Sequence, residues 1–357
     1  MTANSPVFEL LQRNEEIFEG KDLIIAGDIL DPMIFSFVKY AKSATVICDN
    51  YVTCKAMAAM IGKGMDDSFP QIIEYKHVKL IFAEISTAHD HIAMADTLLI
   101  LLSKNKQQTI KLITLLQDKI SDGGSVLTAG SNDGGAKSAD SLLKNLGPVK
   151  KIDLARKCTL FKATVKNRLP AYKTENVIST SLLGFDLQLE QDAAVFSYGK
   201  IDNGTRMLVE SLKEVVPQGC ALDLGCGCGV VGITLSKLGF KNVTSTDVSA
   251  SALALTKKNS TLNHCDDISV KAADMLNGLR KYDLIAVNPP FHVGINTTTA
   301  PTVNMIISAK DHLTKDGVLY LVANSHLGYD NVLLENFTHV KIVASSTTFI
   351  VYRARIN

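Results

Sequence analysis

The stretch Cys220-Ala-Leu-Asp-Leu-Gly-Cys-Gly-Cys-Gly-Val-Val-Gly232 decides the fold of this chain. An apolar run leads into closely spaced glycines, and apolar residues at helical spacing continue through Leu238, which predicts a strand, a tight turn and a helix. Gly225, Gly227 and Gly229 permit positive φ and let a ligand approach the backbone. The free N–H groups at the start of such a helix favour a bound carboxylate or phosphate.

Further buried strands are expected on both sides of this stretch. Continuous apolar runs separated by segments of helical periodicity indicate parallel strands that are covered on both faces. Each half of the chain is therefore expected to be α/β with an open, wound sheet. The expected strands are 22–27, 44–49, 97–102 and 125–130 in the first half, and 220–225, 243–247, 282–287 and 318–323 in the second.

The two halves also resemble each other in order along the chain. Asp49 is matched with Asp247, segment 96–106 with 283–292, and 121–135 with 314–328. We interpret this similarity as a duplication; the alternative is that any two wound sheets show sequence similarity of this kind. The first copy has a single glycine in AGDILDP and reads SKNK where the second reads NPPF, so it is expected to have kept its core and lost its site.

The acids that follow the strands of the second half predict the ligand. Asp247 ends the strand after the glycine turn, where a carboxylate accepts hydrogen bonds from ribose hydroxyls. Gly227-x-Gly229-x-x-Gly232 also satisfies the dinucleotide pattern, so NAD remains an alternative. Asp223 favours S-adenosylmethionine, because it lies inside the strand end, where it would meet an ammonium group.

A third acid supports the same cofactor. Asp274 follows the strand that begins at Ile268, and it could accept a hydrogen bond from an adenine amine. Cys226 and Cys228 lie inside the glycine turn, but a C-x-C pair without a second pair is poor metal-ligand spacing. We interpret these cysteines as small side chains beside the cofactor, and no metal is expected.

Asn288-Pro289-Pro290-Phe291 is the candidate chemical motif, because it directly follows a strand at the ligand-binding edge of the sheet. Two prolines stiffen the turn and remove two N–H donors, which leaves the Asn288 amide oxygen and the Pro289 carbonyl as acceptors. Two fixed acceptors suit a planar NH₂ group, and Phe291 could stack on a base. Positioning would then carry most of the catalysis. The alternative is that the motif is only a rigid turn.

The overall charge of the chain does not predict nucleic-acid binding. Lys and Arg number 37 against 36 Asp and Glu, a net charge of +1, so any nucleic-acid contact must rest on a local patch. Such a patch is expected within 150–173; its candidate RNA-binding residues are Arg156, Lys157, Lys166 and Arg168, although a basic segment can also be a solvated face. His292, next to the proline motif, is a further candidate for substrate contact.

The cysteines and the apolar runs indicate the cellular setting. Seven scattered cysteines do not form a disulfide framework. The apolar run at 97–103 is far shorter than the about 20 residues of a membrane helix. The N-terminus lacks the apolar core of a signal peptide. A cytoplasmic protein that does not bind membranes is expected.

Taken together, these motifs resemble class I S-adenosylmethionine-dependent methyltransferases that modify amino groups. Over almost the whole chain the sequence resembles the RsmC family, which methylates guanine N2 in small-subunit (16S) ribosomal RNA. The segments that carry this resemblance are 4–14 (NSPVFELLQRN), 155–161 (ARKCTLF), 193–205 (AAVFSYGKIDNGT), 288–292 (NPPFH) and 349–356 (FIVYRARI).

The resemblance implies two tandem Rossmann-like methyltransferase domains, of which only the second binds the cofactor. The expected boundaries are 1–165 for a degenerate domain with a structural or substrate-binding role, 166–188 for a linker and 189–357 for the catalytic domain. By the same resemblance, Phe196 and Ser197 fold over the cofactor, and Asn288 also contacts it. The expected partner is ribosomal RNA within the small ribosomal subunit.

Several alternatives stay open at this point. The RlmG family, which acts on large-subunit rRNA, shares the tandem layout and NPPFH, and the motif also suits adenine N6 or a glutamine side-chain amide. An NAD-dependent oxidoreductase and a non-catalytic RNA-binding factor are the alternatives from other classes.

Overall fold

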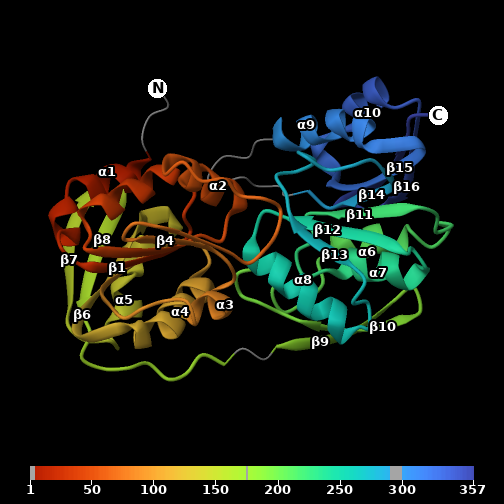
Figure 1. Cartoon of the computed structure of the whole chain (residues 1–357). Helices are drawn as coiled ribbons and strands as arrows, with labels where there is room; N and C mark the ends of the chain where they lie inside the picture. Colours follow the sequence, from red (N-terminus) through yellow and green to blue (C-terminus); the bar gives the residue numbers. More distant parts are fainter. Residues whose placement is uncertain (1–4, 174–175, 290–299) are drawn as a thin grey trace. The chain divides into compact units, whose positions relative to one another are not determined.

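Two wound sheets, each built around a short central strand with a glycine at its end or directly after it, organise the chain (Figure 1). The structure is a computed structural model that describes residues 5–173, 176–289 and 300–357. The chain separates into two compact units, Met1–Thr174 and Glu175–Asn357.

The first unit contains an eight-stranded sheet in the order β3-β4-β2-β1-β5-β6-β8-β7. The central strands pair in parallel, while β3, β7 and β8 run antiparallel to their neighbours. The strands are β1 (Asp22–Gly27), β2 (Ser43–Ile47), β3 (Gln71–Tyr75), β4 (Val78–Phe82), β5 (Ala95–Leu101), β6 (Ile120–Ser131), β7 (Val149–Ala155) and β8 (Cys158–Thr164). The α-helices are α1 (Pro6–Gln12), α2 (Tyr51–Met60), α3 (Ile85–His89), α4 (Lys106–Leu116) and α5 (Asp140–Leu143).

The second unit contains a seven-stranded sheet in the order β13-β12-β11-β14-β15-β17-β16, and a separate hairpin. The sheet strands are β11 (Cys220–Leu224), β12 (Asn242–Asp247), β13 (Ser269–Ala272), β14 (Tyr282–Val287), β15 (Leu313–Asn324), β16 (His339–Ser345) and β17 (Phe349–Arg355). The α-helices are α6 (Asn203–Glu210), α7 (Val230–Leu238), α8 (Ala250–Leu262), α9 (Ala300–Ala309) and α10 (Asp330–Asn336).

The two sheets share one topology. Apart from the extra edge strand β3, both follow the same strand order with the same parallel and antiparallel pairings, and each ends in an antiparallel hairpin at one edge. The last parallel strand is also equally long, 12 residues in β6 and 12 in β15. This agreement confirms the expectation of two tandem wound α/β domains.

The strand registers show which residues correspond. Ile25 pairs with Val46 and Leu99 in the first unit, as Asp223 pairs with Ser245 and Ala286 in the second. With Gly27, at the end of β1, aligned with Gly225, directly after β11, these pairs make Asp223 correspond to Ile25, Asp247 to Cys48 and Asn288 to Leu101. This alignment differs by one residue from the sequence match of Asp49 with Asp247, and it makes Asn50 correspond to Ser249, the residues that cap α2 and α8.

The expected linker 166–188 contains regular structure. Strand β9 (Val177–Leu182) pairs antiparallel with β10 (Phe185–Glu190) around a tight turn, in which Leu183 and Gly184 both have positive φ. Leu187 and Leu189 alternate with exposed residues and are buried in a core cluster of the second unit. The short two-residue turn explains why this alternating pattern forms a hairpin.

Candidate functional site

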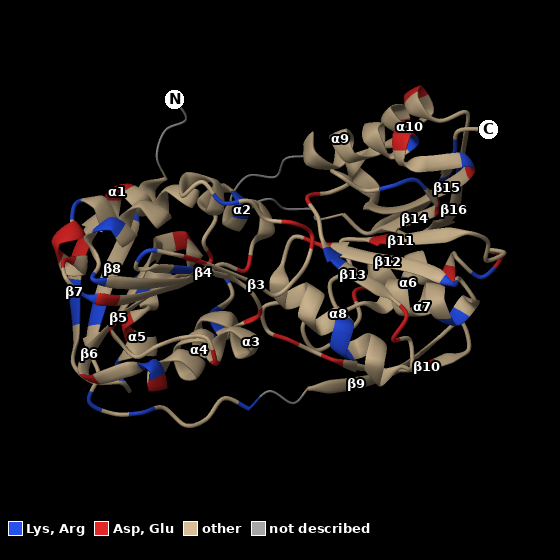
Figure 2. Cartoon of the chain, viewed as in Figure 1, with Lys and Arg blue, Asp and Glu red and all other residues tan. Residues whose placement is uncertain are grey.

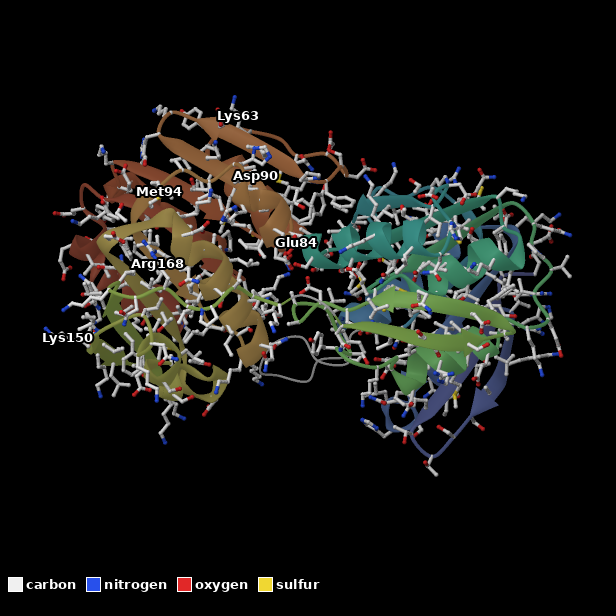
Figure 3. All side chains as sticks on the ribbon, turned by 90° about the horizontal axis from the view of Figure 1, so that it is seen from below. Lys63, Glu84, Asp90, Met94, Lys150 and Arg168 are labelled. Atoms are coloured by element: carbon white, nitrogen blue, oxygen red, sulfur yellow. The ribbon has the colours of Figure 1, made fainter. Side chains whose placement is uncertain are left out.

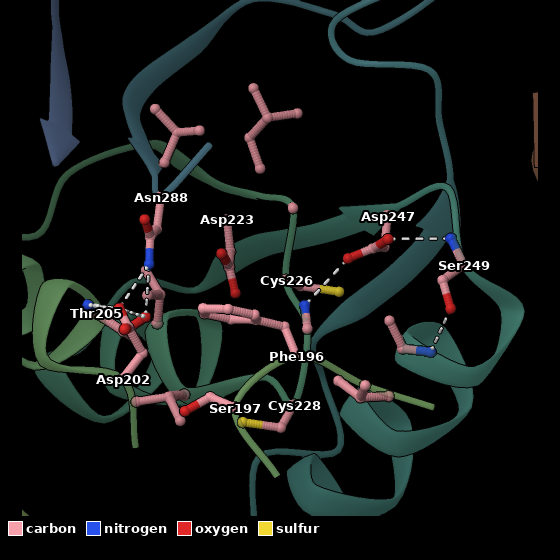
Figure 4. Close-up of a pocket in the computed structure, with 18 of the residues that line it drawn as sticks. Phe196, Ser197, Asp202, Thr205, Asp223, Cys226, Cys228, Asp247, Ser249 and Asn288 are labelled. Atoms are coloured by element: carbon pink, nitrogen blue, oxygen red, sulfur yellow. Dashed lines mark hydrogen bonds between the residues drawn. The ribbon is translucent and has the colours of Figure 1, made fainter. Parts of the chain in front are cut away.

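A cavity of about 500 Å³ opens in the second unit at the carboxyl ends of β11, β12 and β14 (Figure 4). This is the edge of a wound sheet where ligands bind, because the strand order reverses there. Five segments line the cavity: 194–205, the end of β11 with the turn after it, the end of β12 with the start of α8, Ala273 and Met275 after β13, and the end of β14.

The glycine turn has the backbone that only glycine adopts readily. Gly225, Gly227 and Gly229 have φ values of 75°, 55° and 88°. The first two line the cavity, whereas Gly229 is the N-terminal cap residue of α7. A Cβ on Gly232 would lie 2.3 Å from the Ser245 hydroxyl oxygen, so the last glycine of the motif is explained by close packing of α7 against β12.

Asp223 is buried beneath this turn, with 2% of its surface exposed. Its Oδ2 accepts a hydrogen bond of 2.8 Å from the backbone N–H of Gly232. Burial raises the pKa of the Asp223 carboxyl to about 7; the Gly232 N–H opposes that rise, and the charge of Asp247 adds to it. A buried carboxyl in this state is ready to ionise beside a cation.

Asp247 is held in place by two backbone groups. Its Oδ2 accepts from Gly227 N–H at 3.1 Å, and its Oδ1 accepts from Ser249 N–H at 3.0 Å. The carboxylate therefore connects the glycine turn to the start of α8 and lines the cavity. This placement is compatible with the predicted ribose contact.

Asp274 has a different position from the other predicted acids. Ala273 and Met275 on either side of it line the cavity, but Asp274 is not among the lining residues. Its Oδ2 accepts a hydrogen bond of 3.0 Å from the side chain of Asn277.

Asn288 lies at the end of β14 with its amide in one defined orientation. Its Nδ2 donates to Asp202 Oδ2 at 3.1 Å and to the Thr205 hydroxyl at 2.9 Å. Its Oδ1 is buried and has no hydrogen-bond partner among the described residues. Pro289 follows and also lines the cavity. The predicted residues Pro290, Phe291 and His292 lie outside the described residues.

Phe196 and Ser197 line the cavity from the segment before α6. Phe196 is 68% exposed, which is unusual for a phenylalanine. Ser197 has a φ of 65°, and its hydroxyl donates to the backbone oxygen of Lys200 at 3.0 Å. An exposed aromatic ring at the rim of a cavity favours contact with a ligand.

In the glycine turn Cys226 is buried and Cys228 is partly buried, and neither thiol is in a reactive state. Burial raises the pKa of both the Cys226 and Cys228 thiols, that of Cys228 to about 11, so both are protonated near neutral pH. The Thr256 hydroxyl lies 3.2 Å from Cys226 Sγ. Among the described residues no group of three or more His, Cys, Asp and Glu side chains could hold a metal ion.

Asp202 and Thr205 are two lining residues within the segment 193–205 to which the sequence analysis assigned no role. Asp202 is the N-terminal cap of α6, and its Oδ2 accepts from Thr205 N–H at 3.0 Å. An acidic cap residue is a recognisable helix-start signal, but nothing in the sequence places it next to Asn288.

The predicted RNA-binding residues lie in the first unit, around β7 and β8 (Figure 2). Arg156 forms an ion pair with Glu9 at 2.9 Å. Arg168 donates to the backbone oxygens of Gln117 and Ile120 and pairs with Asp122, which gives it a structural role. Lys157 and Lys166 are exposed. Figure 3 shows Lys150 of the same basic segment extending outward from β7.

The chain matches two family descriptions in tandem. Residues 8–181 match "Methyltransferase small domain N-terminal", and residues 186–353 match "Methyltransferase small domain". In the part of the chain that the structure describes, no helix combines the length and apolar character needed to cross a membrane.

Curated relatives align with nearly the full chain. "Ribosomal RNA small subunit methyltransferase C" of Aeromonas hydrophila subsp. hydrophila is 31% identical, covering 99% of this chain and 98% of that protein. The protein of the same name from Psychromonas ingrahamii is 30% identical, covering 95% and 94%. A solved structure of a 16S rRNA N2 methyltransferase (RsmC) of T. thermophilus, in complex with AdoMet and guanosine, matches with a TM-score of 0.79 at 20% identity, covering 99% of this chain and 92% of that one. The two domain matches and these full-length relatives show that the chain belongs to the RsmC family of methyltransferases.

Proposed function

We propose that this chain transfers the methyl group of S-adenosylmethionine to the exocyclic N2 amine of a guanine in 16S ribosomal RNA. The proposal rests on its family membership, on the names of its full-length relatives and on the cavity of the second unit. A methyltransferase family that spans 186–353 argues against the oxidoreductase alternative.

The residues of the cavity fit S-adenosylmethionine. The buried carboxyl of Asp223 suits the ammonium group, and the carboxylate of Asp247 suits the ribose hydroxyls. Gly225 has open space where a side chain would stand, so a ligand can approach its backbone closely. Phe196 would cover the ligand at the rim. When bound, S-adenosylmethionine supplies an electrophilic methyl group on a sulfonium.

Within the cavity, the observation that carries the proposal is the buried amide oxygen of Asn288, which has no hydrogen-bond partner among the described residues. A buried acceptor without a donor costs about 1–3 kcal/mol, which an incoming N–H group would relieve. The Asn288 oxygen and the Pro289 carbonyl would accept the two hydrogens of a planar NH₂ group. Binding both hydrogens would turn the nitrogen lone pair out of the ring's π-system, and this positioning raises its nucleophilicity.

The nitrogen becomes positively charged only as the new C–N bond forms. Its proton is then acidic and can leave to water, so little base catalysis is required before transfer. Asn288 would stabilise the developing positive charge through its carbonyl dipole. The same arrangement suits other NH₂ groups, and the choice of guanine in small-subunit RNA rests on the family.

The substrate is proposed to be rRNA within the small ribosomal subunit, and the protein would act in the cytoplasm where subunits assemble. The net charge of only +1 gives the chain little overall attraction to naked RNA and is compatible with an assembled particle as the substrate. Exposed lysines such as Lys157 and Lys166 could contact phosphates in a salt-sensitive way.

The test uses purified protein, labelled S-adenosylmethionine and three substrates: small subunits, naked 16S rRNA and large subunits from a strain lacking the gene. Mass spectrometry of the nucleosides then identifies the methylated atom. We expect N2-methylguanosine in 16S rRNA, and far less of it in the same time with Asn288→Ala. Label only in large-subunit rRNA, or on an adenine, would overturn the proposed substrate.

A further inference from the structure

We infer that Asp202, together with Thr205, is a positioning residue that orients the Asn288 amide for methyl transfer. This inference rests on the proposed function, in which Asn288 Oδ1 accepts a hydrogen from the substrate amine. It assigns to α6 a role in the chemistry as well as in the packing of the unit.

An asparagine side chain alone does not define which end of its amide faces the cavity. Its two ends have nearly the same shape, and only the hydrogen-bond partners distinguish oxygen from nitrogen. Here both partners of Nδ2 are acceptors: the Asp202 carboxylate at 3.1 Å and the Thr205 hydroxyl oxygen at 2.9 Å. A carboxylate cannot donate, so it excludes the flipped amide.

The orientation of the Asn288 amide determines where its oxygen lies. With the nitrogen turned toward Asp202 and Thr205, Oδ1 is left buried without a partner among the described residues (Figure 4). Asp202, Thr205 and Asn288 all line the same cavity. The carboxylate also polarises the amide, because an N–H donated to an anion increases the negative charge on the amide oxygen.

The start of α6 holds the Asp202 side chain in place. Its Oδ2 also accepts the backbone N–H of Thr205 as the cap of α6. A Cβ on the intervening Gly204 would lie 2.9 Å from that Oδ2 and 3.1 Å from the Phe349 ring. Glycine at this position therefore lets the cap, the strand β17 and the carboxylate pack closely.

Two variants separate the cap from the contact with Asn288. Asp202→Ser retains a good helix cap but is too short to reach the Asn288 amide. Asp202→Asn retains both the cap and the reach, without the charge. Asp186→Ser, on an exposed position of β10, is the matched control for loss of one carboxylate.

The assay measures kcat, KM and the dissociation constant of S-adenosylmethionine with full-length protein and small ribosomal subunits lacking the modification. We expect Asp202→Ser to lower kcat about 10- to 100-fold, the scale of misplacing one oriented group. The cofactor affinity and Tm should stay near those of the unsubstituted protein. Asp202→Asn should recover most of the loss, Thr205→Val should lower kcat several-fold, and Asp186→Ser should match the unsubstituted protein.

A charge exchange gives a test that loss of a helix cap would not mimic. Asn288→Asp would place a carboxylate about where Nδ2 now meets Asp202, so like charges would repel. Adding Asp202→Asn supplies an amide donor to that carboxylate. We expect the double variant to be more active than Asn288→Asp alone, a non-additive result of two substitutions that each lower activity.

The outcomes distinguish this inference from the proposed function. If the unsubstituted protein methylates none of the ribosomal substrates, the proposed function is wrong and this inference falls with it. If the protein is active and Asn288→Ala is not, yet Asp202→Ser keeps full kcat, only the role of Asp202 is wrong. A weakened cofactor affinity with unchanged kcat in Asp202→Ser would make it a cofactor-binding residue and would likewise overturn the inference.

Discussion

The carboxyl of Asp223 should make the binding of S-adenosylmethionine depend on pH. In the ligand-free protein the pKa of Asp223 is raised to about 7 by burial, so the group is largely protonated below neutral pH. A ligand ammonium beside the carboxylate would favour its ionised form and lower that pKa. Binding should therefore release a proton below about pH 7, and the affinity should increase as the pH rises.

The size of the effect follows from the two pKa values. If the ammonium returns Asp223 to the ordinary value of 3.8, the affinity should be about 20-fold weaker near pH 5.5 than near pH 7.5. The folded protein binds this proton more tightly than the unfolded chain does, so acidification between these values does not destabilise the fold through Asp223. The predicted loss of affinity is thus separate from acid unfolding.

Isothermal titration calorimetry checks both quantities. Titrations in two buffers of different ionisation enthalpy count the protons released, and a pH series gives the affinity. Asp223→Asn keeps the shape of the side chain and should give weaker binding that is flat over the same pH range. An affinity of the unsubstituted protein that does not change between pH 5.5 and 7.5, with no proton released, would refute the contact between Asp223 and the ammonium.

Three further outcomes test other parts of the structure. Asn288→Ala should lower kcat about 10²- to 10³-fold, the scale of losing one oriented transition-state partner, with little change in cofactor affinity; unchanged turnover would reduce the motif to a rigid turn. Asp247→Ala should mainly weaken cofactor binding, about 10- to 100-fold, because a charged hydrogen-bond acceptor contributes about 1.5–3 kcal/mol; an unaltered dissociation constant would contradict the ribose assignment. Lys111→Met should destabilise the first unit by about 3–5 kcal/mol in urea unfolding, because it removes the ammonium group that lies 2.7 Å from the carboxylate of Glu84. Combining Lys111→Met with Glu84→Gln should recover much of this loss of stability. An equally unstable double variant would argue against a buried ion pair.

Strands with continuous apolar runs were predictable from the sequence. The predicted strands at 22–27 and 282–287 coincide with β1 and β14, and the helix predicted to end at Leu238 is α7. These elements are specified locally, by burial on both faces or by the glycine turn.

Strands with mixed composition could not be predicted in the same way. β3 and β7 are edge strands with exposed charged residues, such as Glu74 and Lys150, and their pairing depends on the neighbours that the fold brings to them. The contact of Asp202 with Asn288 crosses 86 positions in the chain, so no local pattern contains it. Asp274 accepts a hydrogen bond from Asn277, and its contact with an adenine amine stays a prediction.

The close backbone contact between the ends of β1 and β5 limits any attempt to give the first unit an active site of its own. Gly27 pairs with Leu101, the Leu101 carbonyl oxygen accepts Asp28 N–H at 2.9 Å, and a Cβ on Gly27 would lie 2.2 Å from that oxygen. The acids and the amide of the second unit, installed at Ile25, Cys48 and Leu101, would therefore stand at three buried positions beside this close backbone contact. Three point substitutions of side chains leave that backbone contact in place, so they should not be enough to give this copy activity.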